Sequence, residues 1–176
     1  SEYDWLGVNP MLGDYQAGLI NLPTDKDTNL FVFLGSTIGN FNPEETLDFV
    51  SDLRNSMSDG DYFLLGADLV KNIDVLNAAY HDKQGLTAEF NLNVLRVLNR
   101  EVGSNFDLNK FEHLAYFDTA RSQIEMYLVS LEDQEIRFDA LDASIKLERG
   151  EQILTEISRK FKADDIEFLL TSNDFE

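Results

Sequence analysis

The sequence contains no cysteine and no long hydrophobic segment, and each absence excludes a class of protein. Without cysteine there is no disulfide framework, no thiolate zinc site and no cysteine nucleophile, which suits the reducing cytosol. Apolar runs such as residues 30–34 and 62–65 are far shorter than the roughly 18 to 20 residues that span a bilayer. We therefore expect a soluble, cytoplasmic protein with no membrane-spanning segment.

Basic residues are also scarce, since 14 Lys and Arg stand against 33 Asp and Glu, giving a net charge of −19. A surface of this sign repels phosphate backbones and anionic lipids, and no cluster of basic residues offsets it. Nucleic acid and membranes are therefore not expected partners. With 176 residues, of which 43% are hydrophobic, the chain is long and apolar enough to bury a core, which excludes disorder.

Two apolar runs on either side of a capped helix pattern predict a β-α-β unit. Residues 29–34 and 62–69 are typical of strands buried on both faces of a mainly parallel sheet. Residues 42–45 supply an N-cap, a proline at the first helical position and an acidic residue three after the cap. The apolar positions that follow at helical spacing are Leu47, Val50, Leu53 and Met57. Ligands of such sheets collect at the carboxyl ends of the strands, where residues 35–40 and 68–71 lie.

The pattern changes near residue 85. Helical spacing is expected over residues 72–82 and 87–102, the second with apolar residues four apart at Phe90, Val94, Leu98 and Val102. Close strand patterns then predict an antiparallel layer, with strands at residues 112–117, 123–130, 134–138 and 143–148. Residues 151–161 fit either a strand or a helix, and a final helix begins at Ala163. We predict an α/β fold in which a partial parallel sheet carries an α+β layer of antiparallel strands.

The segment Gly35-Ser36-Thr37-Ile38-Gly39-Asn40 is a candidate binding loop, because glycine lets the backbone turn tightly and approach a ligand closely. An ordinary strand-to-helix loop is an equally good reading. The spacing matches neither the Walker phosphate loop nor Gly-x-Gly-x-x-Gly, so a nucleotide-phosphate site is not indicated. Asn40 offers a donor and an acceptor, although capping the loop is its ordinary role.

Three further polar side chains are candidates, each with a structural alternative. Tyr80 ends a predicted helix and could aim its hydroxyl at a ligand, but a half-buried tyrosine without a ligand is more common. If residues 155–158 are extended, Glu156 and Ser158 share one face, where a carboxylate could accept from a cationic or N–H-bearing ligand. A solvent-facing strand edge is the more frequent alternative. The two histidines, His81 and His113, lack metal-triad spacing and are expected to be structural.

Several short motifs in order along the chain carry a resemblance to a known family. They are Phe33-Leu34-Gly35-Ser36-Thr37-Ile38-Gly39-Asn40-Phe41, Leu65-Gly66-Ala67-Asp68-Leu69-Val70-Lys71, Ala78-Ala79-Tyr80, Thr87-Ala88-Glu89-Phe90-Asn91-Leu92-Asn93, Ile124-Glu125-Met126 and Thr155-Glu156-x-Ser158-x-Lys160. From about residue 13 to 170 the chain resembles the histidine-specific, S-adenosylmethionine-dependent N-α-methyltransferases, which form hercynine in ergothioneine biosynthesis.

The resemblance implies a Rossmann-like methyltransferase core over residues 1–84, a substrate-binding layer over 85–162 and a return helix over 163–176. It implies S-adenosylmethionine as methyl donor, with L-histidine as the small-molecule substrate and no metal. The donor-binding positions are Asp14 and Tyr15 at the adenine and Gly35 at the methionine end. The catalytic positions are Thr37 and Asn40, and the substrate-binding positions are Asn40, Tyr80, Met126, Glu156 and Ser158.

The chemistry of methyl transfer suits these residue types. The reaction is an in-line displacement at a sulfonium, so catalysis gains mainly from holding a neutral amine against the methyl group. A carboxylate such as Glu156 would select an imidazole N–H, because an unpaired buried polar group is costly.

The chain also departs from the family pattern, with Ile157, Phe161 and Tyr127 where other residues are usual. The same fold and chemistry acting on a tryptophan derivative is therefore one alternative, and a non-catalytic acidic interaction module is another.

The family's glycine-rich donor loop belongs upstream of residue 13, and we expect that the sequence is an internal fragment of a longer protein. We predict that the 176-residue chain alone binds the methyl donor weakly and transfers no methyl group. A radiolabelled methyl-transfer assay on the purified chain measures this, and detectable methylation of histidine would contradict it.

Overall fold

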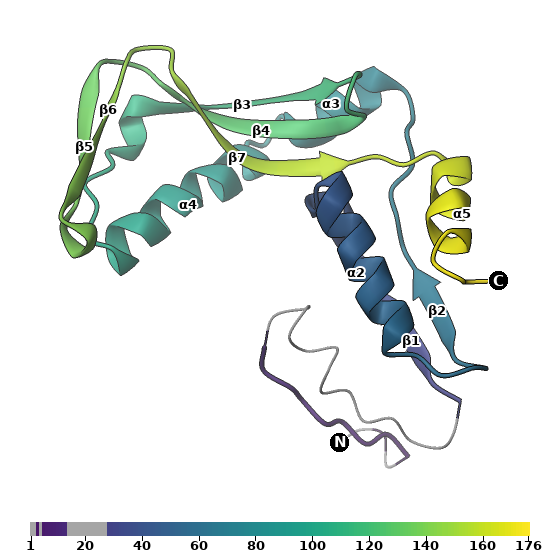
Figure 1. The fold of residues 1–176 in the computed structure, drawn as a ribbon. Helices are drawn as coiled ribbons and strands as arrows, with labels where there is room; N and C mark the ends of the chain where they lie inside the picture. The colour runs from purple at the N-terminus through teal and green to yellow at the C-terminus, as the bar shows by residue number, and fades with distance from the viewer. Residues whose placement is uncertain (1–2, 4, 14–27) are drawn as a thin grey trace.

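The computed structural model describes residues 3, 5–13 and 28–176 (Figure 1). The first half contains β1 (Leu30–Phe33), the 3-10 turn η1 (Thr37–Asn40), α2 (Pro43–Asn55), β2 (Tyr62–Leu65), α3 (Ile73–Tyr80) and α4 (Leu86–Glu101). The second half contains η2 (Leu108–Lys110), β3 (Phe111–Asp118), β4 (Gln123–Ser130), β5 (Gln134–Phe138), η3 (Asp139–Leu141), β6 (Ala143–Leu147), β7 (Gln152–Arg159) and α5 (Ala163–Thr171). Within the described part of the chain, no helix is both long and apolar enough to cross a membrane.

The predicted β-α-β unit is present. Strands β1 and β2 pair in parallel, from Leu30 opposite Tyr62 to Phe33 opposite Leu65, with α2 between them in sequence. The helix begins with a capping box, because Asn42 Oδ1 accepts from the Glu45 backbone N–H at 2.9 Å and the Glu45 carboxylate accepts from the Asn42 N–H at 2.7 Å. The N-cap, the proline and the acidic residue of this helix are confirmed.

One face of the parallel pair is open, so the expectation of strands buried on both faces is wrong for the described residues. Helices α2 and α5 pack on the same face, in a cluster that includes Phe33 and Leu65. Side chains of the other face are about half exposed or more: Leu30, Val32, Tyr62 and Leu64. The second strand also ends at Leu65, and Leu69 forms only an isolated bridge to Phe161.

The antiparallel layer is a sheet in the order β3-β4-β7, flanked by a β5-β6 hairpin. Its strands lie where the sequence predicted them to within about one residue, and the ambiguous segment 151–161 is a strand. Pairing with β4 makes this segment a strand. β7 runs antiparallel to β4, from Gln152 opposite Val129 to Arg159 opposite Gln123. The ladder has an irregularity between Met126 and Tyr127.

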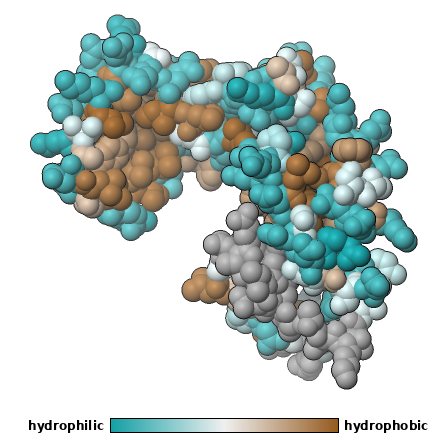
Figure 2. Space-filling view, viewed as in Figure 1, coloured by the Kyte–Doolittle hydropathy of each residue, from teal (hydrophilic) through white to brown (hydrophobic). Residues whose placement is uncertain are grey.

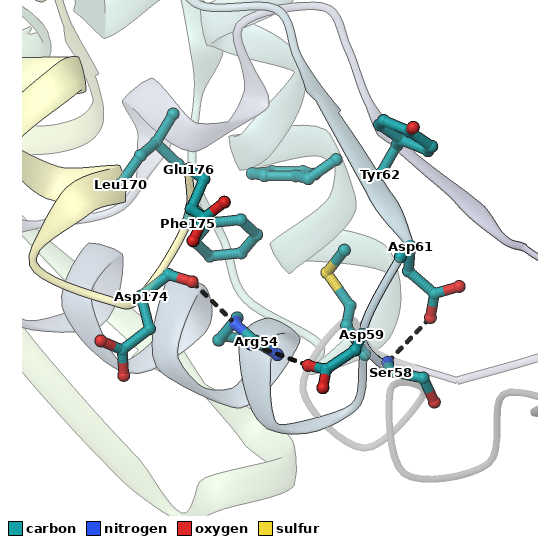
Figure 3. Close-up of a pocket in the computed structure, with 12 residues that line it drawn as sticks. Arg54, Ser58, Asp59, Asp61, Tyr62, Leu170, Asp174, Phe175 and Glu176 are labelled. Atoms are coloured by element: carbon teal, nitrogen blue, oxygen red, sulfur yellow. Dashed lines mark hydrogen bonds and ion pairs between the residues drawn. The ribbon is translucent and has the colours of Figure 1, made fainter.

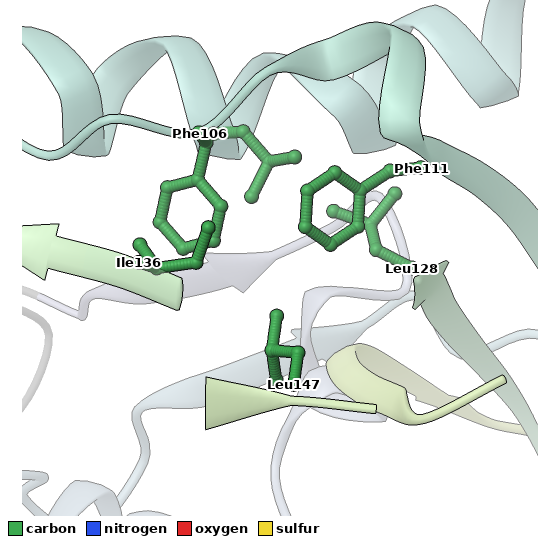
Figure 4. Packing of buried hydrophobic residues seen from close by; sticks show 6 residues of the cluster. Phe106, Phe111, Leu128, Ile136 and Leu147 are labelled. Atoms are coloured by element: carbon green, nitrogen blue, oxygen red, sulfur yellow. The ribbon is translucent and has the colours of Figure 1, made fainter. Parts of the chain in front are cut away.

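Among the residues that the structure describes, three separate apolar clusters hold these elements. The parallel-pair core contains Ile38, Phe49, Val50, Phe161 and Leu169. The α3 core lies between α3 and the sheet and contains Leu76, Ala115, Phe117, Ile124 and Met126. The hairpin core, drawn in Figure 4, contains Leu95, Phe106, Phe111, Leu128, Ile136 and Leu147.

Helix α4 turns a different face to the sheet from the one its apolar spacing indicates. Phe90 is 65% exposed, whereas Asn91 and Leu95 are buried. The Asn91 side-chain amide donates to the Tyr127 carbonyl at 3.0 Å and lies 2.9 Å from His113 Nδ1, so a buried polar contact helps to set the face. Figure 2 shows apolar side chains left on the surface over α4 and the β5-β6 hairpin.

The residues that follow β7 contact the chain that follows β2. Phe161 donates its N–H to the Asp68 carbonyl and accepts from the Val70 N–H, both at 2.9 Å, which forms an isolated parallel bridge to Leu69 beyond the end of β2. The turn η1 packs against the same stretch, and a Cβ built on Gly39 would lie 2.8 Å from the Arg159 carbonyl oxygen. Only glycine allows this close approach.

We predict that Gly39→Ala lowers the free energy of unfolding by about 1 to 3 kcal/mol, because the added methyl group meets the backbone of β7. Denaturant unfolding of the purified protein measures the change. Gly7→Ala is the control, since a Cβ at that position has no neighbour within 4 Å. Equal effects of the two substitutions would show that the contact between η1 and β7 is not tight.

Candidate active site

The loop after β1 lies at the carboxyl end of the parallel pair, where the sequence predicted a binding loop. Gly35 has a φ of +78°, a conformation that favours glycine. Ser36 fastens the loop to the chain beyond β2, because its hydroxyl accepts from the Asp68 N–H at 2.9 Å. Thr37 donates its hydroxyl to the Leu34 carbonyl at 3.1 Å, and Asn40 at the end of η1 is exposed. Three of the predicted residues, Gly35, Thr37 and Asn40, therefore share this loop.

Residues far apart in sequence form a polar cluster beside this loop. The Tyr80 hydroxyl donates to Ser158 Oγ at 2.9 Å. Lys160 Nζ donates to the Tyr80 hydroxyl oxygen at 3.0 Å and to Ser158 Oγ at 2.8 Å. The ammonium also lies 5.0 Å from the centre of the Tyr80 ring. The structure thus brings Tyr80 and Ser158 into direct contact.

The cation of this cluster is buried. The Lys160 side chain is 1% exposed, and its ammonium lies 3.4 Å from Asp68 Oδ2. Lys71, which is on the surface, contacts the other oxygen of Asp68 at 2.7 Å. Partial burial acts to raise the pKa of Asp68, but the hydrogen bond from Lys71 and the charge of Lys160 outweigh it, so the pKa lies below its ordinary value.

Glu156 lies on the same side of β7 as Ser158. It is opposite Met126 in the ladder between β4 and β7, so the two side chains share one face of the sheet. Burial raises the pKa of Glu156, and the nearby charge of Lys160 partly opposes this effect. Met126 is 2% exposed and belongs to the α3 core, where Tyr80 packs against the cluster.

The remaining predicted residues have simpler outcomes. Asp14 and Tyr15 lie outside the described residues. The ring nitrogens of His113 lie 2.9 Å from the Asn91 side chain and 2.9 Å from the Tyr80 carbonyl oxygen, and its structural role stays a prediction. Its second contact holds the end of α3, and through it the position of Tyr80.

A separate hollow lies at the other end of the parallel pair, and of the predicted site residues that the structure describes none lines it (Figure 3). Arg54 crosses it, donating to the Asp174 carbonyl at 3.1 Å and lying 3.8 Å from Asp59. Because Asp61 and Tyr62 in its wall lie at the amino-terminal end of β2, it is remote from the edge of the sheet where ligands of this fold collect.

Sequence reasoning assigned no role to Lys160 or to Asp68. The alternation of Glu156, Ser158 and Lys160 at every second residue was the available signal, because such residues share a face of an extended chain. For Asp68 the available signal was its place at the carboxyl end of the second predicted strand, where ligands of parallel sheets bind.

The fold and this cluster define an α/β protein in which polar side chains gather between a parallel strand pair and an antiparallel sheet. The family model described as histidine-specific methyltransferase, SAM-dependent, matches residues 1–176. The chain belongs to this family.

Known proteins and a solved structure are similar to the chain. It is 44% identical over 161 residues to a histidine N-alpha-methyltransferase of Mycobacterium tuberculosis, covering 92% of this chain and 50% of the relative. It is 42% identical over 166 residues to one of Mycolicibacterium smegmatis, covering 94% and 51%. The chain thus spans about half the length of these curated relatives. A crystal structure of an S-adenosylmethionine-dependent methyltransferase from Clostridium acetobutylicum aligns over 93% of this chain and 52% of that one, with a TM-score of 0.40 and 13% identity.

We predict that Asp68→Asn lowers the free energy of unfolding at pH 7 by about 1 to 3 kcal/mol, because Lys160 loses its counter-charge. The effect is smaller than for a fully buried pair, since the Asp68 side chain is 34% exposed. Denaturant unfolding measures it, with Asp48→Asn on the exposed side of α2 as the control.

The pH dependence of this effect has a defined sign. Because the pKa of Asp68 is lowered by folding, its contribution is present above about pH 4 and is lost as the pH falls through the folded-state pKa. The difference between wild type and Asp68→Asn should therefore narrow at acid pH. If the difference in unfolding free energy between the two proteins widens at acid pH, the lowered pKa of Asp68 is contradicted.

Proposed function

We propose that the protein carrying this chain transfers a methyl group from S-adenosylmethionine to the α-amine of L-histidine, the reaction that forms hercynine in the family. The observation that carries the proposal is the polar cluster of Tyr80, Ser158 and Lys160, with Glu156 on the same face of β7. Together with family membership, this cluster supplies hydrogen-bonding groups suited to an amino acid with a polar ring.

The loop after β1 fits the methionine end of the donor. Gly35 is exposed and turns with a positive φ, which leaves the backbone open to a ligand at the carboxyl end of β1. In this proposal Asp14 and Tyr15 contact the adenine. Residues 1–84 then belong to the donor-binding core and residues 85–162 to the substrate layer. Residues 163–176 return to the core, which agrees with the packing of Leu169 beside Phe33.

The substrate amine would be oriented by Asn40 and Tyr80, with Thr37 beside the reacting atoms. S-adenosylmethionine supplies an electrophilic methyl group on a sulfonium. As the C–N bond forms, the C–S bond breaks and its electron pair stays on sulfur, and the amine then loses a proton to water. The protein's contribution is position, since a neutral amine needs to be aligned rather than activated by a strong base.

The imidazole would lie against Glu156 and Ser158, with Met126 beneath it in the sheet. A half-buried carboxylate makes a ring N–H a preferred partner, because an apolar ring would leave that carboxylate unpaired. This arrangement favours histidine over an apolar amino acid.

We predict that the full-length protein binds L-histidine saturably in the presence of S-adenosylhomocysteine, and that Glu156→Ala weakens binding by at least about tenfold, the cost of one lost hydrogen bond to a charged group. Isothermal titration calorimetry measures both. Glu135→Ala, on the exposed side of β5, is the control and should bind as wild type does. Wild-type protein that binds no histidine would contradict the proposed substrate.

A further inference from the structure

Tyr80 is held at both of its ends by the two edge strands of the sheet β3-β4-β7. Its hydroxyl lies 2.9 Å from Ser158 Oγ on β7. Its backbone carbonyl oxygen lies 2.9 Å from His113 Nε2 on β3. Because Tyr80 is the last residue of α3, its carbonyl is one of the four that a helix leaves without a donor of its own. His113 supplies that donor.

The partners of the His113 ring determine which nitrogen carries the hydrogen. A carbonyl oxygen only accepts, so Nε2 carries the hydrogen that Tyr80 receives. On the other side of the ring, Asn91 Nδ2 donates to the Tyr127 carbonyl at 3.0 Å, which identifies this atom as the amide nitrogen. The same nitrogen lies 2.9 Å from His113 Nδ1, so Nδ1 accepts and carries no hydrogen. Asn91 therefore selects the tautomer of His113 that can donate to Tyr80.

A second contact between α3 and β3 confines the effect of His113 to the last turn of the helix. Asn77 Oδ1 accepts from the Phe117 N–H at 2.8 Å, and Leu76 is buried in the α3 core. These contacts hold the body of α3 whether or not His113 donates. The ring of His113 is buried, with 8% of the residue exposed, so water is a poor substitute for its N–H at the Tyr80 carbonyl.

We propose that His113 is a positioning residue for methyl transfer. In the tautomer set by Asn91, its Nε2–H holds the backbone of Tyr80, and this keeps the Tyr80 hydroxyl in the polar cluster where it meets the substrate. His113 contacts none of the reacting atoms and acts through Tyr80. This rests on the proposed function, in which Tyr80 orients the substrate amine.

Two substitutions separate the two contacts of the ring. His113→Gln places an amide nitrogen as many bonds from Cβ as Nε2, so it can still donate to Tyr80. His113→Asn places an oxygen as many bonds from Cβ as Nδ1, so it can still accept from Asn91 but does not reach Tyr80. Dissociation constants for L-histidine are measured by calorimetry on the full-length protein with S-adenosylhomocysteine, and those for S-adenosylhomocysteine are measured separately.

His113→Asn should weaken histidine binding about tenfold, whereas His113→Gln should stay within about threefold of wild type. Both variants should bind S-adenosylhomocysteine as wild type does. His81→Asn is the matched control, because His81 is the exposed histidine next to Tyr80, and it should leave both affinities unchanged. Equal losses in the two His113 variants, or a larger loss in His113→Gln, would show a merely structural role and overturn the proposal.

A double-mutant cycle tests whether His113 acts through the Tyr80 hydroxyl. In a Tyr80→Phe background that hydroxyl is gone, so adding His113→Asn should weaken histidine binding by less than about twofold. A further tenfold loss in that background would contradict the proposal.

If His113→Asn does not fold, the 15N chemical shifts of the His113 ring in the wild-type protein still test the proposal. A hydrogen on Nε2 supports it, and a hydrogen on Nδ1 overturns it. Failure of wild type to bind histidine would instead overturn the proposed function itself.

Discussion

The arrangement of the molecule depends on one stretch of backbone, residues 152–161, which is hydrogen-bonded both in the antiparallel sheet and to the chain that follows β2. As β7 it forms an edge of the antiparallel layer, and two residues later Phe161 pairs with the chain that continues β2. These bonds fix the position of the antiparallel sheet relative to the chain after β2 through backbone groups, which do not depend on side-chain identity. Ser158 and Lys160 lie on this segment, so the polar cluster forms at the place where the two layers are joined.

Backbone geometry also determines how closely the loop at residues 35–40 approaches β7. Gly39 lets η1 contact β7 directly, and Ser36 binds the backbone of Asp68. Asp68 in turn faces Lys160. The loop proposed to hold the methyl donor and the cluster proposed to hold the substrate are therefore linked by a short chain of hydrogen bonds and one ion pair.

Local features of the fold could be predicted because their causes are local. The capping box at Asn42 needs only residues 42–45, and the antiparallel strands were visible as short apolar patterns between turns. The family resemblance supplied the pairing of Glu156 with Ser158. The structure added the direct contact of Tyr80 with Ser158 across 78 positions of sequence.

Features that depend on long-range polar contacts could not be predicted in the same way. The buried face of α4 includes Asn91, whose partners His113 and Tyr127 come from two different strands, and apolar periodicity says nothing of such an amide. Lysine is ordinarily a surface residue, so the burial of Lys160 follows only from its contacts with Tyr80, Ser158 and Asp68.

The polar cluster is supported by two separate apolar cores, and their stabilities determine how often it is complete. Phe161 beside it belongs to the parallel-pair core, whereas Tyr80 packs on the α3 core, and the two cores share no buried residue. Regions with separate cores open with their own free energies. The cluster exists only while both regions are closed, so the less stable of the two sets the fraction of molecules in which the cluster is complete at any moment.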